Sequence, residues 1–310
     1  MLNQIKGLHH VTSFAGPAQP NNAFFTRTLG LRRVKKTVNF DAPDVYHLYY
    51  ADGVGTPGSV MTYFPFPHSA RGKPGVGEVS TTSFSVPTGS LPAWETRLGG
   101  QGVKGMSRDF RFGQNRLLFD GTDGDSFALI ETNRDNPDRW TGNGVGEAMA
   151  ITGFHSAAIR LADADATADL LQFMGYEQVE KQDNVTRFRV ANGNGADLVD
   201  IEAIPGAKAA QQGAGSVHHL AFAVENRAAQ LAVRKALTDA GAAVTPVIDR
   251  NYFWSIYFRT PGGVLFELAT NEPGFDHDED TAHLGQALML PHQHEHLRAS
   301  LETSLEPLTD

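Results

Sequence analysis

The chain has 310 residues, 41% hydrophobic and 20% charged, which is enough for about two globular domains of ordinary size. A net charge of −9 argues against a nucleic acid or an anionic membrane as partner, because either needs a basic face. Cysteine is absent, so disulfides and thiolate sites are excluded and any metal must be bound by His, Asp or Glu. Since no segment resembles a membrane span or a signal peptide, we expect a cytoplasmic protein.

Four segments along the chain share one predicted order of elements. Each opens with a strand, continues into a short helix, and ends in strands rich in β-branched and aromatic residues. The opening strands are expected at residues 8–14, 79–86, 154–161 and 217–224, and the helices at residues 22–29, 90–98, 164–174 and 226–240. A glycine that is typical of a helix C-terminus follows each helix, at Gly30, Gly99, Gly175 and Gly241. The sequence therefore predicts a βαβββ module that occurs four times.

An internal repeat relates the first module to the fourth. Residues 8–12 (LHHVT) resemble residues 217–221 (VHHLA), and residues 55–63 (GTPGSVMTY) resemble residues 259–267 (RTPGGVLFE) at nearly the same displacement. Residues 153–157 (GFHSA) are a fainter copy of the doublet segment. Such a repeat indicates that the modules share one structure.

The modules are expected to pair, because a sheet of this size cannot bury its apolar face alone. Residues 137–144 (PDRWTGNG) are rich in turn formers and lie near the midpoint, so we place a domain boundary there. The prediction is an α+β fold of four βαβββ modules, paired into two domains whose curved mixed sheets form a cup. The domains cover residues 1–144 and 145–275, and a tail covers residues 276–310.

Strand alternation decides which histidine of a doublet faces the cup. In the fourth module Leu220 and Phe222 are large and apolar, which suits packing against a helix, so His219 points into the cup. By the same reasoning Phe266 faces the helix side and Glu267 faces the cup.

The turn before Glu267 supports this assignment. If residues 261–263 form a three-residue loop, Tyr257 lies opposite Glu267 on the same face. His10 is placed in the cup by its alignment with His219 in the repeat. Two imidazoles and one carboxylate that leave coordination positions free are what a non-haem Fe(II) centre for oxygen activation needs. We therefore expect His10, His219 and Glu267 to be metal ligands.

The chain resembles the vicinal oxygen chelate (glyoxalase and extradiol dioxygenase) superfamily, and within it the ring-cleaving hydroquinone dioxygenases. The resemblance rests on the two His-His doublets, on FEL at residues 266–268, on YHLYYAD at residues 46–52 with the following GTPG, and on LGQALMLP at residues 284–291. It covers essentially the whole chain. It implies that Fe(II) or Mn(II) is bound by the second His of each doublet and by Glu267, and that the substrates are a small aromatic diol and O₂.

The resemblance also implies which residues contact the substrate. They are His9, Thr12, His218, Arg250 and Tyr257. Our hypothesis is that His218 is the base, Tyr257 donates a proton, Arg250 stabilises negative charge, and the other two orient groups near the metal.

The family's catechol-cleaving members draw their ligands from the C-terminal half, whereas this chain has Ser156 at the third module's ligand position. The resemblance therefore implies that module one pairs with module four.

Two other functions fit the same fold. A glyoxalase-type isomerase uses four protein ligands, but Tyr63 stands where the first module would supply the matching acid. A non-catalytic protein that binds small molecules needs no metal. The residues do not decide between a hydroquinone and a catechol, and they leave a homo-oligomer open.

Several charged clusters have simpler interpretations. Residues 292–296 (HQHEH) are expected in a solvated helix or an interface, and residues 276–280 (DHDED) in a mobile acidic connector. Residues 32–36 (RRVKK) are typical of the solvated edge of a strand. His47 and His68 could approach the opening of the cup, and nothing in the sequence decides this.

Overall fold

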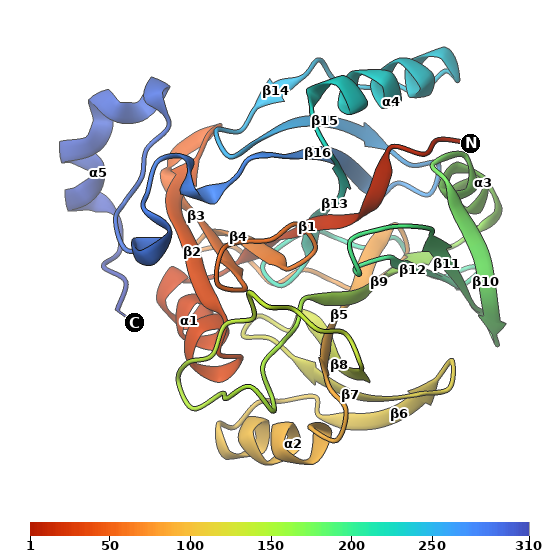
Figure 1. The fold of residues 1–310 in the computed structure, drawn as a ribbon, viewed down its shortest axis with the longest axis horizontal. Coiled ribbons are helices and arrows are strands. Elements are labelled where there is room, and N and C mark those ends of the chain that lie inside the picture. The colour runs from red at the N-terminus through yellow and green to blue at the C-terminus, as the bar shows by residue number, and fades with distance from the viewer. Residues whose placement is uncertain (310) are drawn as a thin grey trace.

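Two curved, mixed sheets of eight strands each make up the computed structural model, which describes residues 1–309 (Figure 1). The first module contributes β1 (Ile5–Ala15), β2 (Arg32–Asn39), β3 (Ala42–Ala51) and β4 (Val60–Pro65). The second contributes β5 (Glu78–Pro87), β6 (Ser107–Arg111), β7 (Gln114–Asp120) and β8 (Ser126–Thr132). The third contributes β9 (Phe154–Leu161), β10 (Tyr176–Gln182), β11 (Val185–Val190) and β12 (Leu198–Ala203). The fourth contributes β13 (Val217–Val224), β14 (Ile248–Asp249), β15 (Phe253–Arg259) and β16 (Leu265–Pro273).

The strand order confirms the predicted fold of four βαβββ modules. One sheet has the order β14-β15-β16-β13-β1-β4-β3-β2 and joins module four to module one, while β10-β11-β12-β9-β5-β8-β7-β6 joins module three to module two. The two central strands β1 and β13 are antiparallel, and each is parallel to the last strand of its own module. Each sheet thus combines one module from each half of the chain. The division into domains at residue 144 stays a prediction, and it does not coincide with the division between the sheets.

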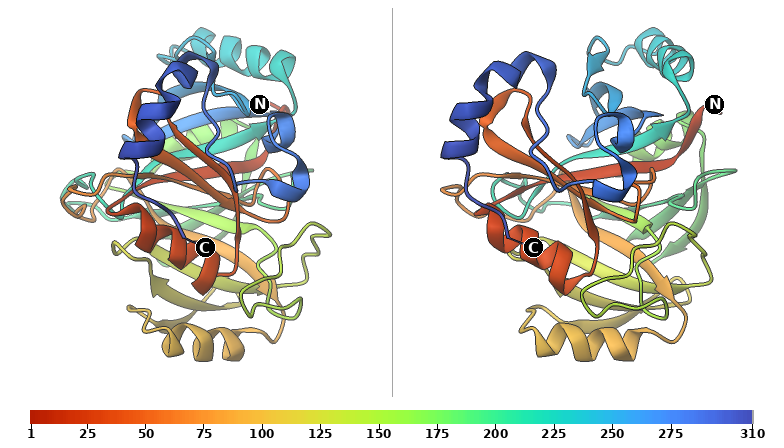
Figure 2. Two further views of the ribbon diagram at one scale, coloured as in Figure 1. Left: turned by 90° about the vertical axis from the view of Figure 1, so that its left-hand side faces the viewer. Right: turned by 60° about the vertical axis from the view of Figure 1, so that its left-hand side comes forward.

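Each module carries its helix between the first two strands, as predicted. The helices are α1 (Ala18–Ala23), which continues as a π-helix over Phe24–Thr28, α2 (Leu91–Gly100), α3 (Asp165–Phe173) and α4 (Arg227–Asp239). Figure 2 shows α2 and α4 at opposite ends of the molecule. Gly30, Gly175 and Gly241 follow their helices with positive φ, but Gly99 lies inside α2 and Gly102 takes that conformation instead.

The main core lies where the two sheets meet. Phe222 of β13 packs against Tyr176 of β10 with ring centroids 5.8 Å apart, and Leu220 and Val224 on the same face are also fully buried. This confirms that the large apolar residues of β13 face away from the cup. Small residues such as Ala221 lie on the other face of β13, which is the cup face. The alternation therefore leaves room on the cup side for functional groups.

The tail crosses β2 and β3, and two interpretations of charged segments prove wrong (Figure 1). Residues 276–280 are anchored, because Asp278 Oδ1 lies 2.6 Å and Glu279 Oε2 lies 2.5 Å from the ammonium of Lys35. Lys35 is fully buried, and Arg33 is buried with its Nε donating to the Gly285 carbonyl, so residues 32–36 are no solvated edge. The tail covers Arg33 and Lys35 and supplies the acidic partners of Lys35. The local sequence around residues 32–36 does not reveal this distant partner.

Short helices run from the end of the fourth module through the tail. They are η2 (Phe275–His277), η3 (Thr281–His283), η4 (His292–Leu297) and α5 (Arg298–Ser304). His294 of η4 lies 2.9 Å from the Phe40 carbonyl, so part of the histidine cluster fastens the tail to the β2–β3 turn.

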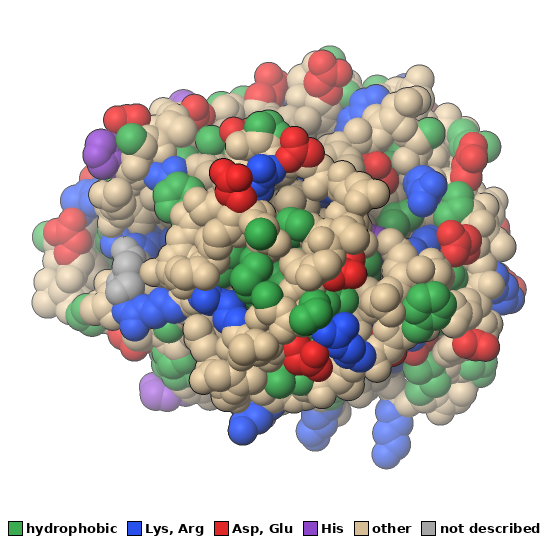
Figure 3. All heavy atoms as spheres, turned by 60° about the horizontal axis from the view of Figure 1, so that its bottom comes forward, with side chains coloured by type: hydrophobic (Ala, Val, Ile, Leu, Met, Phe, Trp, Pro, Cys, Tyr) green, Lys and Arg blue, Asp and Glu red, His purple; other side chains and the backbone are tan. Residues whose placement is uncertain are grey.

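The surface agrees with the composition. Acidic and basic side chains are interspersed over the face shown in Figure 3. Within residues 1–309, no helix is both long and apolar enough to cross a bilayer.

Candidate metal centre

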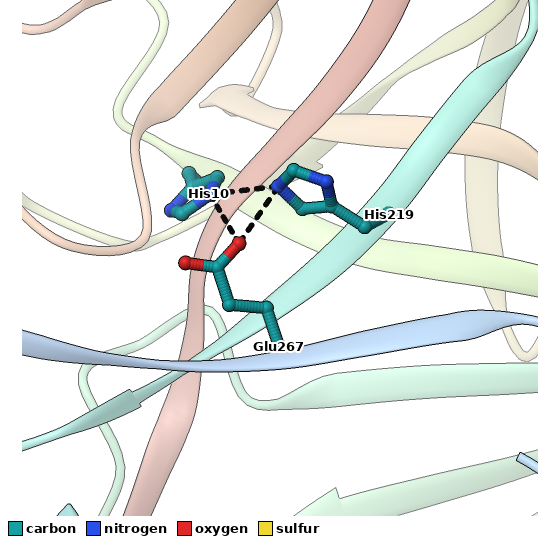
Figure 4. A group of neighbouring side chains, drawn as sticks. All are labelled: His10, His219 and Glu267. Atoms are coloured by element: carbon teal, nitrogen blue, oxygen red, sulfur yellow. Dashed lines mark hydrogen bonds and ion pairs between the residues drawn. The ribbon is translucent and has the colours of Figure 1, made fainter. Parts of the chain in front are cut away.

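Three side chains from three adjacent strands meet in the cup of the first sheet (Figure 4). His10 Nε2 lies 3.1 Å from His219 Nε2 and 3.2 Å from Glu267 Oε2, and His219 Nε2 lies 2.8 Å from the same oxygen. The register explains the meeting, because Ala221 of β13 is paired with His10 on one side and with Glu267 on the other. All three side chains are buried. The structure thus brings together the three residues that the sequence selected as ligands.

The donor atoms of this group suit a divalent cation. Glu267 Oε1 accepts a hydrogen bond from Ser255 Oγ at 2.5 Å, whereas Oε2, which faces both imidazoles, has no hydrogen-bond partner in the described chain. Two imidazole nitrogens and an unsatisfied carboxylate oxygen within 4.8 Å of one another fit a metal ion.

A hydrogen-bond relay orients His10 from behind. His9 Nε2 lies 3.1 Å from the Thr270 carbonyl, which can only accept, so His9 donates from Nε2. Burial, chiefly, lowers the pKa of His9 to about 3, so its Nδ1 is free to accept from His10 Nδ1 at 2.9 Å. The lone pair of His10 Nε2 then points at Glu267 and His219. Metal-binding histidines are commonly fixed in this way through their second nitrogen.

A cavity of about 250 Å³ adjoins the group. Its walls are largely aromatic, formed by Phe14, Phe40, Tyr49, Phe64, Phe253 and Tyr257, with polar groups from His47, His218 and Arg250. Arg250 Nε donates to the Tyr257 hydroxyl at 3.3 Å, and Arg250 Nη1 lies 3.3 Å from Asp41 Oδ2 at the rim. Burial and the nearby Glu267 charge raise the pKa of Tyr257, so it is a neutral phenol at neutral pH. Such a cavity suits a small aromatic molecule.

The five residues expected to contact the substrate fall into two groups. His218, Arg250 and Tyr257 line the cavity. His9 and Thr12 are buried and are not among the residues that line it; His9 contacts His10, and Thr12 Oγ1 lies 3.1 Å from Thr62 Oγ1.

The predicted turn is confirmed and accounts for the place of Tyr257. Thr260 N donates to the Val264 carbonyl at 2.9 Å, Gly263 has φ of 89°, and Tyr257 is paired with Glu267 in the register. The three-residue loop therefore sets the register in which Tyr257 and Glu267 lie on the same face of β15 and β16.

Two polar residues of the site had no assigned role from the sequence. Ser255 donates a hydrogen bond to Glu267. Strand alternation could have indicated this contact, because Ser255 lies two residues before Tyr257 and therefore on the same cup face. His47 lines the cavity, whereas His68 is exposed.

The second sheet has a cup without this chemistry. Its cavity of about 400 Å³ is lined by paired charges, among them Arg116 with Asp109. At the position equivalent to His219 it has Ser156, which contacts His155. Within residues 1–309, His10, His219 and Glu267 form the one group with a ligand geometry of this kind.

Comparisons with known proteins show the family of this chain. The family "Glyoxalase/Bleomycin resistance protein/Dioxygenase superfamily" matches residues 153–268. The "Putative ring-cleaving dioxygenase MhqO" of Bacillus subtilis is 40% identical over 308 residues, which are 99% of this chain and 98% of that protein. The "Chlorohydroquinone/hydroquinone 1,2-dioxygenase" of Sphingobium indicum is 36% identical over 310 residues, covering 96% of this chain and 95% of that protein. A crystal structure of a "putative dioxygenase" from Bacillus subtilis has a TM-score of 0.95 and 39% identity, and the match covers 99% of this chain and 98% of that one. The chain belongs to the glyoxalase/bleomycin resistance protein/dioxygenase superfamily, as a member of its ring-cleaving dioxygenases.

Proposed function

We propose that this protein is a metal-dependent dioxygenase that cleaves the ring of a hydroquinone-like aromatic diol in the cup of the first sheet. The observation that carries the proposal is the convergence of His10, His219 and Glu267 beside an aromatic-walled cavity. The reaction breaks one ring carbon–carbon bond, and O₂ is the oxidant whose two atoms both enter the product. The relative that acts on hydroquinones supports a para-diol as substrate.

The two imidazoles and the carboxylate would hold Fe(II) or Mn(II). When bound, such a metal would supply coordination positions for a substrate oxygen and for O₂. The fixed tautomer of His10 and the hydrogen bond from Ser255 to Glu267 would present the ligand atoms without rearrangement.

Residues of the cavity wall bind and orient the substrate. Phe14, Phe64 and Phe253 enclose the ring on apolar faces. Arg250 carries a permanent positive charge and stabilises the negative charge of a deprotonated hydroxyl. Tyr257, kept neutral and in contact with Arg250, donates a hydrogen bond to oxygen as negative charge develops there.

The proposed role of His218 changes once the tautomers are considered. Its Nδ1 lies 2.9 Å from Nδ1 of His219, whose Nε2 faces the metal centre. His219 therefore donates from Nδ1, and His218 accepts there. Burial, chiefly, lowers the pKa of His218 to about 3, so the neutral ring carries its proton on Nε2. We assign His218 as a hydrogen-bond donor to the substrate or O₂ in place of the base role inferred from sequence.

The test is anaerobic loading with Fe(II) or Mn(II), followed by an oxygen-electrode screen of hydroquinones and catechols. We expect one O₂ consumed per diol and none with a hemithioacetal. His219→Ala is the matched control and should lose both metal and turnover. Metal retention below about a tenth of an equivalent, or no uptake with any diol, would contradict the proposal.

The isomerase alternative is disfavoured by Tyr63. Its hydroxyl contacts Asp125 in the interior, and the group around Glu267 contains three ligand residues in the part of the chain that the structure describes.

A further inference from the structure

A continuous chain of hydrogen bonds runs through one wall of the cavity. The Tyr49 hydroxyl lies 2.8 Å from His47 Nδ1, His47 Nε2 lies 2.7 Å from Thr62 Oγ1, and Thr62 Oγ1 lies 3.1 Å from Thr12 Oγ1. All four residues are buried, and His47 and Tyr49 line the cavity together with His10, His219 and Glu267. None of these hydrogen bonds is needed to hold the metal ligands.

Packing fixes the two residues at the cavity end of this chain. The ring of His47 lies between Phe64 and Tyr49, with centroid distances of 4.2 and 4.1 Å. The ring of Tyr49 is backed by Phe275 of η2, with ring centroids 5.2 Å apart. Tyr49 is also paired with Thr62 in the β3–β4 register, which places the chain across adjacent strands. The Tyr49 hydroxyl therefore occupies a fixed position.

The hydroxyl of Tyr49 has an unused hydrogen-bonding capacity. A phenol has one donor and two acceptor sites, and His47 uses one of them. Burial chiefly keeps His47 neutral by lowering its pKa and raises the pKa of Tyr49. If Tyr49 donates to His47 it can still accept, and if His47 donates then Tyr49 can donate. Either arrangement suits a substrate hydroxyl, which can both donate and accept.

We propose that the Tyr49 hydroxyl binds the second hydroxyl of a para-diol whose first oxygen lies at the metal centre, with His47 and Thr62 as positioning residues. This inference rests on the proposed function. Adjacent oxygens of a catechol both lie at the metal end of the ring, whereas the second oxygen of a hydroquinone lies at the opposite end. Tyr49 is thus the residue that distinguishes a para-diol from an ortho-diol.

The experiment measures binding, not turnover. Protein loaded with Fe(II) is titrated anaerobically with phenol, hydroquinone and catechol by calorimetry. We expect Tyr49→Phe to weaken hydroquinone binding about five- to tenfold, the effect of one hydrogen bond, and to leave phenol and catechol binding unchanged. Tyr46→Phe is the matched control on the same strand, because its hydroxyl donates to the Glu306 carbonyl away from the cavity.

A second variant separates positioning from folding. Thr62→Val removes the partner of His47 Nε2 and should lower the hydroquinone-to-phenol affinity ratio while phenol affinity is kept. An unchanged ratio in both Tyr49→Phe and Thr62→Val overturns the inference and leaves the proposed function standing. Failure of wild-type protein to bind any of the three ligands overturns both. Equal loss of phenol and hydroquinone in Tyr49→Phe indicates a structural role and also overturns the inference.

Discussion

Replacing Ser255 by alanine tests how the carboxylate of Glu267 is oriented. Ser255 is fully buried, and its hydroxyl donates to Glu267 Oε1 at 2.5 Å, which turns Oε2 toward His10 and His219. A hydrogen bond to a charged group contributes about 1.5–3 kcal/mol. Loss of a group that orients a metal ligand costs about 10–100-fold in affinity, equivalent to about 1.4–2.8 kcal/mol. Since the two ranges agree, we expect Ser255→Ala to weaken Fe(II) or Mn(II) binding by about 10–100-fold.

The assay is an anaerobic metal titration against a competing chelator, with circular dichroism as the measure of folding. Ser80→Ala is the matched control, because the Ser80 hydroxyl lies in the second sheet and contacts the Ala158 carbonyl at 3.4 Å. The control should keep wild-type affinity. A folded Ser255→Ala protein with metal affinity within about twofold of wild type would refute the reasoning, because the lost orientation should cost at least tenfold.

Three further predictions test the tail, the second sheet and the cavity. Lys35→Met should lower the free energy of unfolding in urea by about 3–5 kcal/mol, because it leaves the carboxylates of Asp278 and Glu279 without their counter-charge. Adding Asp278→Asn and Glu279→Gln to this variant should restore much of the lost free energy. Burial and nearby arginines lower the pKa of His155 to about 3, against 6.5 when unfolded. Neutral His155 therefore does not oppose folding above pH 6.5, and the free energy of unfolding falls as the pH drops from 6.5 toward 3. The free energy of unfolding of wild type should fall between pH 7 and pH 5 by about 2 kcal/mol more than that of His155→Gln. Tyr257→Phe should lower turnover by about 10–100-fold at unchanged metal content, and equal turnover would contradict its proposed contact with the substrate.

The meeting of His10, His219 and Glu267 was largely predictable, because its geometry follows from periodic features of the sequence. Strand alternation sorts His219 from its neighbour, and the repeat transfers that choice to His10. The place of Tyr257 opposite Glu267 follows from the length of one loop, which Gly263 permits with its positive φ. These features are local or repeat-related, so a single sequence contains them.

Contacts between distant segments could not be predicted in the same way. Lys35 and Asp278 are 243 positions apart, and each belongs to a charge run of the kind that is usually solvated. The contacts of His47 with Thr62 and Phe64 lie across two strands, and Phe275 lies behind Tyr49. Family resemblance implies that His9 and Thr12 contact the substrate; both are buried and neither lines the cavity, so this contact stays a prediction.

The candidate metal centre depends on assembly of the first sheet. His10 comes from the first module, and His219 and Glu267 come from the fourth, so the three donor atoms meet after β1 has paired with β13. A metal that binds this arrangement and not the unfolded chain stabilises the pairing of the two modules, by about 2.7 kcal/mol at a hundredfold excess over Kd. The tail acts on the same junction, because Asp278 pairs with Lys35 of β2 and accepts a hydrogen bond from the Tyr252 hydroxyl of the fourth module. Metal binding and tail docking should therefore both stabilise the pairing of modules one and four.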